Sequence, residues 1–336
     1  GMAQAGRRWQ RALFPWLLEC GLKQSESDTS VFFCERDVQV DKQTRHEWLL
    51  VGCYVDDLFV LYSHNDEASL YHNFILKLRE RWKVEDEGPV SDLLNVEIDR
   101  RDDGSVTLRQ TGYIDRLASE FLPTDVPPSA QRAKTPADES LPQLIADALS
   151  SEDAVDEALR KRYQSLVGAL LYAASYTRPD IAYAVGMLCR AMARPTPELY
   201  SAAERVLQYL VRHREVGLRY APEDGFARGF SDSDWAVRRS TTGWVYMLSC
   251  AAISWASKRQ DSVALSSCEA EIMAASDASK EAIYLSRFTA EMGMKDPSPI
   301  NVYLDNQGAI DLAYNPEHHQ RTKHIERRHF FIREAV

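Results

Sequence analysis

The stretch Trp48-Leu49-Leu50-Val51-Gly52-Cys53-Tyr54-Val55-Asp56-Asp57-Leu58-Phe59-Val60-Leu61-Tyr62 holds two adjacent aspartates at the centre of an otherwise apolar run. An apolar run predicts buried strand. Two carboxylates at its middle are costly to bury without partners, so Asp56 and Asp57 must lie at a tight turn or hold a metal ion. A solvated hairpin turn is the simpler alternative, because aspartate is common in turns. The strongly apolar flanks on both sides favour the metal interpretation.

Composition limits the classes of protein to consider. The length of 336 residues suggests about two domains, and the 45% hydrophobic and 27% charged residues are ordinary for a globular protein. A net charge of −10 argues against a general binder of polyanions, so any contact with nucleic acid must rest on local patches or on metal. The six cysteines form no C-x-x-C pair, which excludes a zinc ribbon and fits a reducing compartment. The N-terminal residues lack the apolar segment typical of a signal peptide, and no apolar stretch of about 20 residues predicts a membrane span.

The first part of the chain, residues 1–122, has a mixed helix and strand pattern. Asp-Gly between the extended runs 93–99 and 105–108 predicts a hairpin at Asp102-Asp103-Gly104. The apolar spacings predict helices over 8–20 and 67–82, a strand over 30–33, and two strands within 48–62.

The middle of the chain changes character twice. Residues 123–158 hold five prolines, and seven acidic residues but no basic residue lie between Lys134 and Arg160, which predicts an exposed linker. Residues 159–222 then predict packed helices over 160–176, 179–192 and 197–211, with proline opening the second and third.

The last part, residues 223–336, predicts the order β-β-β-α-β-α. The expected strands cover 226–235, 242–248, 252–257 and 300–304, and the expected helices cover 266–292 and 308–314. Three acidic residues lie at positions that can bring them together. Asp232 lies within the first strand, Glu271 near the start of the long helix, and Asp305 at the end of the fourth strand. These three positions can converge on one point.

Three converging carboxylates repel one another strongly, so a metal ion is their natural neutraliser. Two Mg²⁺ ions about 4 Å apart would activate water and stabilise the leaving oxygen of a phosphodiester. Each acid alone has a plainer interpretation as a surface carboxylate, and Glu271 could merely interact with the helix dipole. The ordered set of three favours the metal site.

Polar and basic residues near the C-terminus are candidates for nucleic-acid contacts. Asn306 and Gln307 follow Asp305, and amide side chains can contact base edges and 2′-hydroxyls; the alternative for Asn306 is a helix cap. The segment 317–334 is the one basic patch, with Arg321, Lys323 and His324 as candidates for phosphate contact. A solvated helix face is the alternative.

On these motifs the chain resembles the Pol polyprotein of copia-type LTR retrotransposons, covering part of the reverse transcriptase and part of its RNase H. The similarity runs in the family's order through nearly the whole chain. The matching segments are Gln4-Ala5-Gly6-Arg7-Arg8-Trp9, Tyr54-Val55-Asp56-Asp57, residues 165–172, Thr177-Arg178-Pro179-Asp180, Ser240-Thr241-Thr242-Gly243, residues 253–255 with 258–260, residues 264–271, Asp305-Asn306-Gln307 and Arg321-Thr322-Lys323-His324-Ile325.

The resemblance implies an α/β (α+β) architecture. A partial reverse-transcriptase palm with the start of a thumb would occupy 1–122, the linker 123–158 and a helical connection 159–222. An RNase H-like β-β-β-α-β-α domain without its last strand and helix would occupy 223–336.

The resemblance also implies RNA-directed DNA synthesis at Asp56 and Asp57, with Tyr54 near the primer end, and cleavage of the RNA of a hybrid at Asp232, Glu271 and Asp305. Mg²⁺ would be the cofactor, with Mn²⁺ as a substitute. Lys258 and Arg259 would join the nucleic-acid contacts. The implied partners are an RNA template and DNA primer, dNTPs, the RNA–DNA hybrid and the rest of the polyprotein, with no membrane. The implied location is cytoplasmic virus-like particles and the nucleus.

The chain departs from the family pattern at several positions. The family has a further metal-binding Asp upstream of residue 4 and a fourth RNase H acid beyond residue 336, and this sequence contains neither. Glu326 stands where the family has Asp, and Asn95 where it prefers Gly. We therefore expect an excerpt of a longer reading frame that has no polymerase activity by itself. The alternative is a catalytically inactive remnant that only binds nucleic acid or protein.

Overall fold

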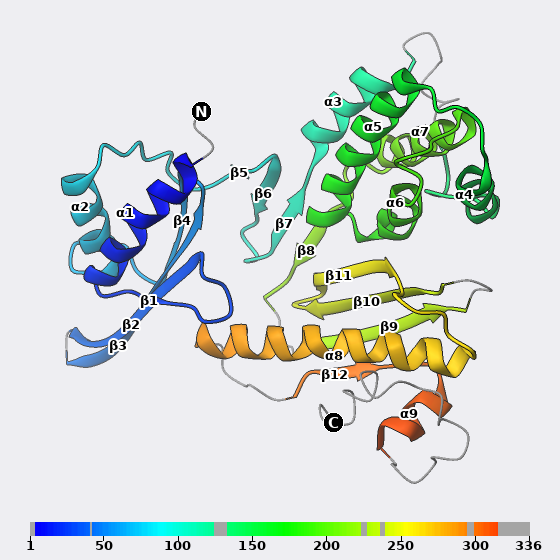
Figure 1. Cartoon of the computed structure of the whole chain (residues 1–336). Helices are drawn as coiled ribbons and strands as arrows, with labels where there is room; N and C mark the ends of the chain where they lie inside the picture. The colour runs from blue at the N-terminus through cyan, green and yellow to red at the C-terminus, as the bar shows by residue number, and fades with distance from the viewer. Residues whose placement is uncertain are drawn as a thin grey trace. The chain divides into compact units, whose positions relative to one another are not determined.

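The chain has a mixed α/β fold (Figure 1). The computed structural model describes residues 4–40, 42–123, 133–222, 227–235, 239–293 and 299–314. Residue contacts divide the chain into two compact units, one of residues 1–88 and 283–299 and the other of residues 89–282 and 300–336.

The first unit is built on an antiparallel sheet whose strands follow chain order. They are β1 (Lys23–Gln24), β2 (Val31–Val40), β3 (Gln43–Tyr54) and β4 (Asp57–Tyr62). Helices α1 (Ala5–Glu19) and α2 (Leu70–Arg81) pack on one face. Their buried leucines and Phe74 meet Phe32, Leu49 and Val51 of the sheet, which confirms the expected helices and the strand–turn–strand arrangement.

Strand β2 is longer than the apolar run 30–33 predicts. Its extension pairs with the start of β3, from Cys34 opposite Leu49 to Val40 opposite Gln43. The buried carboxylate of Glu47 is paired there with Arg36 and Arg45, and both guanidinium groups hold the pKa of Glu47 below its usual range even though burial alone would raise it. The hydrophobic pattern did not predict this extension of β2, because charged residues that form ion pairs take the place of apolar residues there.

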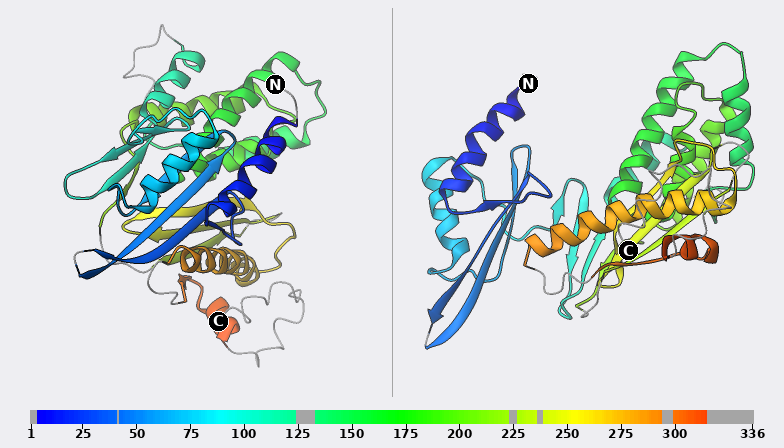
Figure 2. Two further views of the ribbon diagram at one scale, coloured as in Figure 1. Left: turned by 90° about the vertical axis from the view of Figure 1, so that its left-hand side faces the viewer. Right: turned by 60° about the horizontal axis from the view of Figure 1, so that its bottom comes forward.

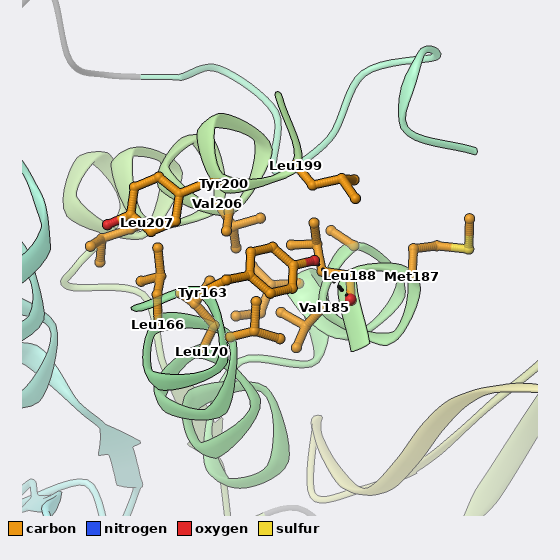
Figure 3. Close-up of a cluster of buried hydrophobic side chains, with 14 of the residues drawn as sticks. Tyr163, Leu166, Leu170, Val185, Met187, Leu188, Leu199, Tyr200, Val206 and Leu207 are labelled. Carbon is orange, nitrogen blue, oxygen red and sulfur yellow. Dashed lines mark hydrogen bonds between the residues drawn. The ribbon is translucent and has the colours of Figure 1, made fainter. Parts of the chain in front are cut away.

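The second unit contains a helical bundle and two four-stranded sheets. The bundle holds α3 (Thr111–Phe121), α4 (Leu141–Ser150), α5 (Glu157–Tyr176), η1 (Pro179–Ile181), α6 (Ala182–Cys189) and α7 (Pro197–Arg212). Figure 3 shows the centre of its core, where the fully buried Tyr163 donates its hydroxyl to the Leu188 carbonyl at 2.8 Å. The three predicted helices of this region are confirmed. No helix among the described residues is long and apolar enough to cross a membrane.

The predicted exposed linker 123–158 is wrong over its second half. Helix α4 lies inside this segment, and its Leu141, Ile145 and Ala148 are buried in the core of the bundle. The apolar residues recur at helical spacing, and Pro142 in the first turn is compatible with a helix start. The helical spacing was overlooked because the prolines and acidic residues of the segment suggested a linker. Residues 124–132 lie outside the described part.

The structure also groups residues 89–122 differently from the predicted domain 1–122. The sheet β5 (Asp92–Leu93), β6 (Val96–Arg100), β7 (Val106–Arg109) and β8 (Leu218–Tyr220) joins this segment to the far end of the helical region. The predicted hairpin is β6–β7, with Gly104 at a φ of 79° in its turn. Tyr113 of α3 donates to the Ala169 carbonyl of α5 at 3.0 Å. These contacts place the segment in the second unit.

The third sheet follows the predicted order β-β-β-α-β-α. It consists of β9 (Arg228–Asp234), β10 (Thr241–Leu248), β11 (Ala251–Arg259) and β12 (Asn301–Tyr303), arranged β11-β10-β9-β12, with β12 parallel to β9 and the other pairs antiparallel. Helix α8 (Ser267–Glu291) runs across one face of this sheet in the views of Figures 1 and 2. Tyr246 and Gln260 donate to carbonyls of its first half, and α9 (Gln307–Tyr314) follows β12.

Candidate functional site

Three acids of the second unit come together at one end of the third sheet. Asp232 lies on β9, Glu271 in the second turn of α8, and Asp305 two residues after β12. One carboxylate oxygen of each lies within 4.8 Å of the others. The parallel pairing of Tyr303 with Phe230 brings this about, because Asp232 and Asp305 each follow two residues after this pair. The sequence predicted this convergence, and the structure places the three side chains together.

Glu271 is the buried member of this carboxylate cluster, with only 5% of its surface exposed. Its Oε1 accepts hydrogen bonds from the Ser233 hydroxyl at 2.7 Å and the Ser233 amide at 3.1 Å. Its Oε2 is buried and has no hydrogen-bond partner among the described residues. Desolvation raises the pKa of Glu271, the negative charges of Asp232 and Asp305 raise it further, and the Ser233 bonds oppose the shift.

The donor set fits a hard divalent cation. All three groups offer carboxylate oxygens, which are the ligands that Mg²⁺ and Mn²⁺ favour. A buried oxygen without a partner is costly, and a cation would satisfy it while neutralising the mutual repulsion of the three groups. These residues can therefore hold a metal ion.

Two of the residues predicted to touch nucleic acid have partners within the second unit. Asn306 caps α9, because its Oδ1 accepts from the Ala309 amide at 3.0 Å, which is the capping alternative. Gln307 donates its side-chain amide to Asp311 at 2.7 Å.

The predicted basic contacts are only partly described. Lys258 forms an ion pair with Asp277 at 3.1 Å, and its ammonium group lies 4.8 Å from the centre of the Trp244 ring. Arg259 ends β11 and is exposed. Arg321, Lys323 and His324 lie outside the described residues.

The two central aspartates of the first unit lie at a hairpin turn. Tyr54 ends β3, Asp57 begins β4 and pairs with it, and Val55 and Asp56 form the loop. Val55 has a φ of 54°, a conformation that a β-branched side chain rarely adopts. Tyr54, Asp56 and Asp57 are all exposed. The turn therefore presents both carboxylates to solvent, which agrees with a plain hairpin turn and with a metal site alike.

Sequence reasoning missed two features near the carboxylate cluster. The first is Ser233, whose alternation with acids in Ser231-Asp232-Ser233-Asp234 was the available signal. The second is a cleft of about 580 Å³ between η1 and α6 on one side and the third sheet on the other. Asp180 and Tyr183 line it from the helices and Phe230, Asp232 and Trp255 from the sheet. No local sequence pattern foretells this packing.

Comparisons with known proteins agree with the motifs. Residues 1–134 match the family described as reverse transcriptase (RNA-dependent DNA polymerase), which defines the class of this part of the chain. The whole chain is 32% identical over 341 residues to the retrovirus-related Pol polyprotein from transposon TNT 1-94 of Nicotiana tabacum. It is 33% identical over 342 residues to that from transposon RE1 of Arabidopsis thaliana, and 32% identical over 341 residues to that from transposon RE2 of the same plant.

The chain belongs to the family of copia-type retrotransposon Pol polyproteins. Each of the three alignments covers 100% of this chain but only 24%, 22% and 22% of the respective relative. The chain thus spans about a quarter of the length of the curated relatives that it matches.

Proposed function

We propose that this chain forms adjoining parts of the reverse transcriptase and the ribonuclease H of a retrotransposon polymerase. The observation that carries the proposal is the convergence of Asp232, Glu271 and Asp305 from three separate elements, with one buried carboxylate oxygen that no other described residue contacts by a hydrogen bond. The reverse-transcriptase match over residues 1–134 and the Pol relatives support the polymerase part.

The proposed hydrolysis acts on the RNA strand of an RNA–DNA hybrid. Asp232, Glu271 and Asp305 would hold Mg²⁺, or Mn²⁺ in its place, which when bound activates water and stabilises the charge on the leaving oxygen. Glu271 contributes an anchored carboxylate, because two donors fix one of its oxygens. The exposed Asp232 and Asp305 leave the cluster accessible to a phosphodiester. Arg259 lies on the same sheet, where it would contact phosphate.

The proposed polymerisation uses Asp56 and Asp57 at the β3–β4 turn. In the whole polyprotein these carboxylates would hold Mg²⁺ jointly with a further Asp, and they would serve an RNA template, a DNA primer and dNTPs. Tyr54 ends the strand beside them and is 52% exposed, so its ring is free to contact the primer end. The strained Val55 supports a functional turn, since backbone strain of this kind persists mainly at sites where it is used.

The test is cleavage of a labelled RNA–DNA hybrid in the presence of Mg²⁺ or Mn²⁺. We expect cleavage that Asp305→Asn lowers at least about 100-fold, because one metal ligand loses its charge. Asp311→Asn is the matched control, since Asp311 is an exposed acid on the neighbouring helix outside the cluster. Cleavage that Asp305→Asn leaves unchanged would refute the assignment of the site. Binding of the hybrid with no cleavage under any metal would favour the alternative, a module that only binds nucleic acid.

A further inference from the structure

Ser233 links two members of the carboxylate cluster. Its backbone amide donates to Oδ1 of Asp232 at 2.8 Å and to Oε1 of Glu271 at 3.1 Å, and its hydroxyl donates to the same Oε1 at 2.7 Å. Ser233 lies on β9 opposite Thr242 of β10, so its backbone position is fixed by the sheet. One residue on a rigid strand therefore holds carboxylates that come from a strand and from a helix.

Both Ser233 donors that reach Glu271 bind the same oxygen. This pairing fixes the rotation of the carboxylate and assigns different roles to its two oxygens: Oε1 is satisfied within the protein, and Oε2 remains buried and without a partner among the described residues. Any residue except proline at position 233 would supply the amide, but only serine or threonine would supply a hydroxyl on so short a side chain.

We propose that Ser233 is a positioning residue that orients Glu271, so that Oε2 is the oxygen available to a divalent cation held with Asp232 and Asp305. The inference rests on the proposed metal site and adds a residue that the acid pattern does not contain. Hydrogen bonds that orient a ligand commonly change metal affinity by about 10- to 100-fold when they are removed. Because the amide bonds would persist in an alanine variant, we expect the lower end of that range.

The experiment measures Mn²⁺ binding to the chain by isothermal titration calorimetry, without nucleic acid. Ser233→Ala should weaken the apparent Kd about 10-fold, and Ser233→Thr should restore it to within about threefold, because threonine keeps the hydroxyl and suits a strand. Ser231→Ala is the matched control: Ser231 lies two residues earlier on the same strand, is more deeply buried than the half-buried Ser233, and its hydroxyl has no partner among the described residues. It should bind Mn²⁺ like the unaltered chain.

The outcomes separate this inference from the proposed function. Mn²⁺ binding that requires Asp305 but is unaffected by Ser233→Ala would overturn the role of Ser233 alone. A Ser233→Thr variant that binds as weakly as Ser233→Ala would also overturn it, since the hydroxyl would then not be the cause. Failure of the unaltered chain to bind Mn²⁺ through Asp305 would overturn the proposed metal site, and the inference with it. Melting temperatures measured without metal verify that each variant is folded.

Discussion

Val55 is the β-branched residue that adopts a positive φ in the described part of the chain. Its φ of 54° lies in the left-handed region, and its side chain is 57% exposed, so little burial offsets the strain. An L-residue in this conformation costs roughly 1–2 kcal/mol relative to glycine, while glycine in the unfolded chain costs about 0.5–1 kcal/mol in entropy. We expect Val55→Gly to leave stability unchanged or to raise it by up to about 1 kcal/mol.

Calorimetric melting of Val55→Gly beside Val60→Gly tests this prediction. Val60 lies in the middle of β4 and packs against the core of the first unit, so glycine there should lower the melting temperature by several degrees. Equal destabilisation by the two variants would show that the loop carries no strain.

Arg178 is the largest fully buried side chain among the residues of the second unit that the structure describes. It forms a bidentate pair with Asp180 at 2.9 and 2.7 Å and donates to the His213 carbonyl at 3.0 Å. Removing the carboxylate leaves the buried Arg178 guanidinium without its charged partner, so Asp180→Ala should destabilise by about 3 kcal/mol. Asp115→Ala, which breaks the exposed pair with Arg214, should cost less than about 1 kcal/mol. Thermal melting of both variants tests this prediction, and an equal loss of stability in the two variants would contradict it.

The same pair has a predictable pH dependence. Burial alone would raise the pKa of the Asp180 carboxyl, but the hydrogen bonds and charge of Arg178 outweigh it and hold that pKa below its usual range. A carboxyl with a lowered pKa in the folded state stabilises the fold above its unfolded pKa of about 3.9, and this stabilisation is lost as pH falls through the folded-state pKa. The stability gap between the unaltered chain and Asp180→Asn should therefore shrink below about pH 4.

Individual site residues could be predicted where chemistry restricts the alternatives. The convergence of Asp232, Glu271 and Asp305 followed from their places on a strand, a helix start and a strand end. Asn306 could not be decided, because an amide after a strand serves equally as a cap or a contact, and the structure shows the cap. Ser233 could not be found, because serine next to acids is common and its partner lies 38 positions away.

Helix α4 gives a sharp test at the level of elements. Ile145 is buried in the bundle core and Leu149, on the same helix, is 42% exposed. Ile145→Ala should cost about 2–5 kcal/mol through the cavity it leaves, whereas Leu149→Ala should cost under about 1 kcal/mol. Similar melting temperatures for the two variants would mean that this segment is the exposed linker that its composition suggests.

Elements with a clear apolar period were predicted to within a few residues. Helices α5 and α7 follow this rule, because each buries one face. Helix α8, in which residues 269–276 are all buried, and strands β9 to β12 were also predicted to within a few residues. Strand β2 was predicted too short because it is held by ion pairs, with the half-exposed Arg36 covering the buried Glu47, rather than by an apolar pattern. Helix α4 was missed for the opposite reason, since its apolar face lies within a segment rich in proline and acids.

For the molecule as a whole, the two units have separate hydrophobic cores. Leu17 is fully buried in the first and Leu170 is fully buried in the second. Units with their own cores can unfold independently. We expect calorimetry to resolve two transitions, with Leu17→Ala lowering one and Leu170→Ala lowering the other, each by several degrees. A single transition that both variants lower equally would show that the units unfold as one cooperative body.

The domain boundaries were the least predictable feature at this scale. A change in composition near residue 122 suggested a boundary there, yet β7 pairs with β8 more than a hundred residues later. Such pairing depends on which strand edge is available in the folded chain, and amino-acid composition does not predict which edge that is. The first segment of the first unit ends instead at Gly88, whose φ is 76°.

The two-residue turn at Val55 and Asp56 also limits how this segment can vary in length. Tyr54 and Asp57 are paired across it, and Leu58 and Val60 of β4 pack against the core from alternate positions. Because side chains alternate between faces, one inserted or deleted residue that shifts β4 would turn both away from the core and place Asp57, Phe59 and Leu61 there instead. Substitutions can accumulate in this hairpin, whereas single-residue insertions and deletions that shift the register of β4 are disfavoured. We therefore expect functional relatives of this sequence to keep the number of residues between Val51 and Val60 even where the residues themselves differ.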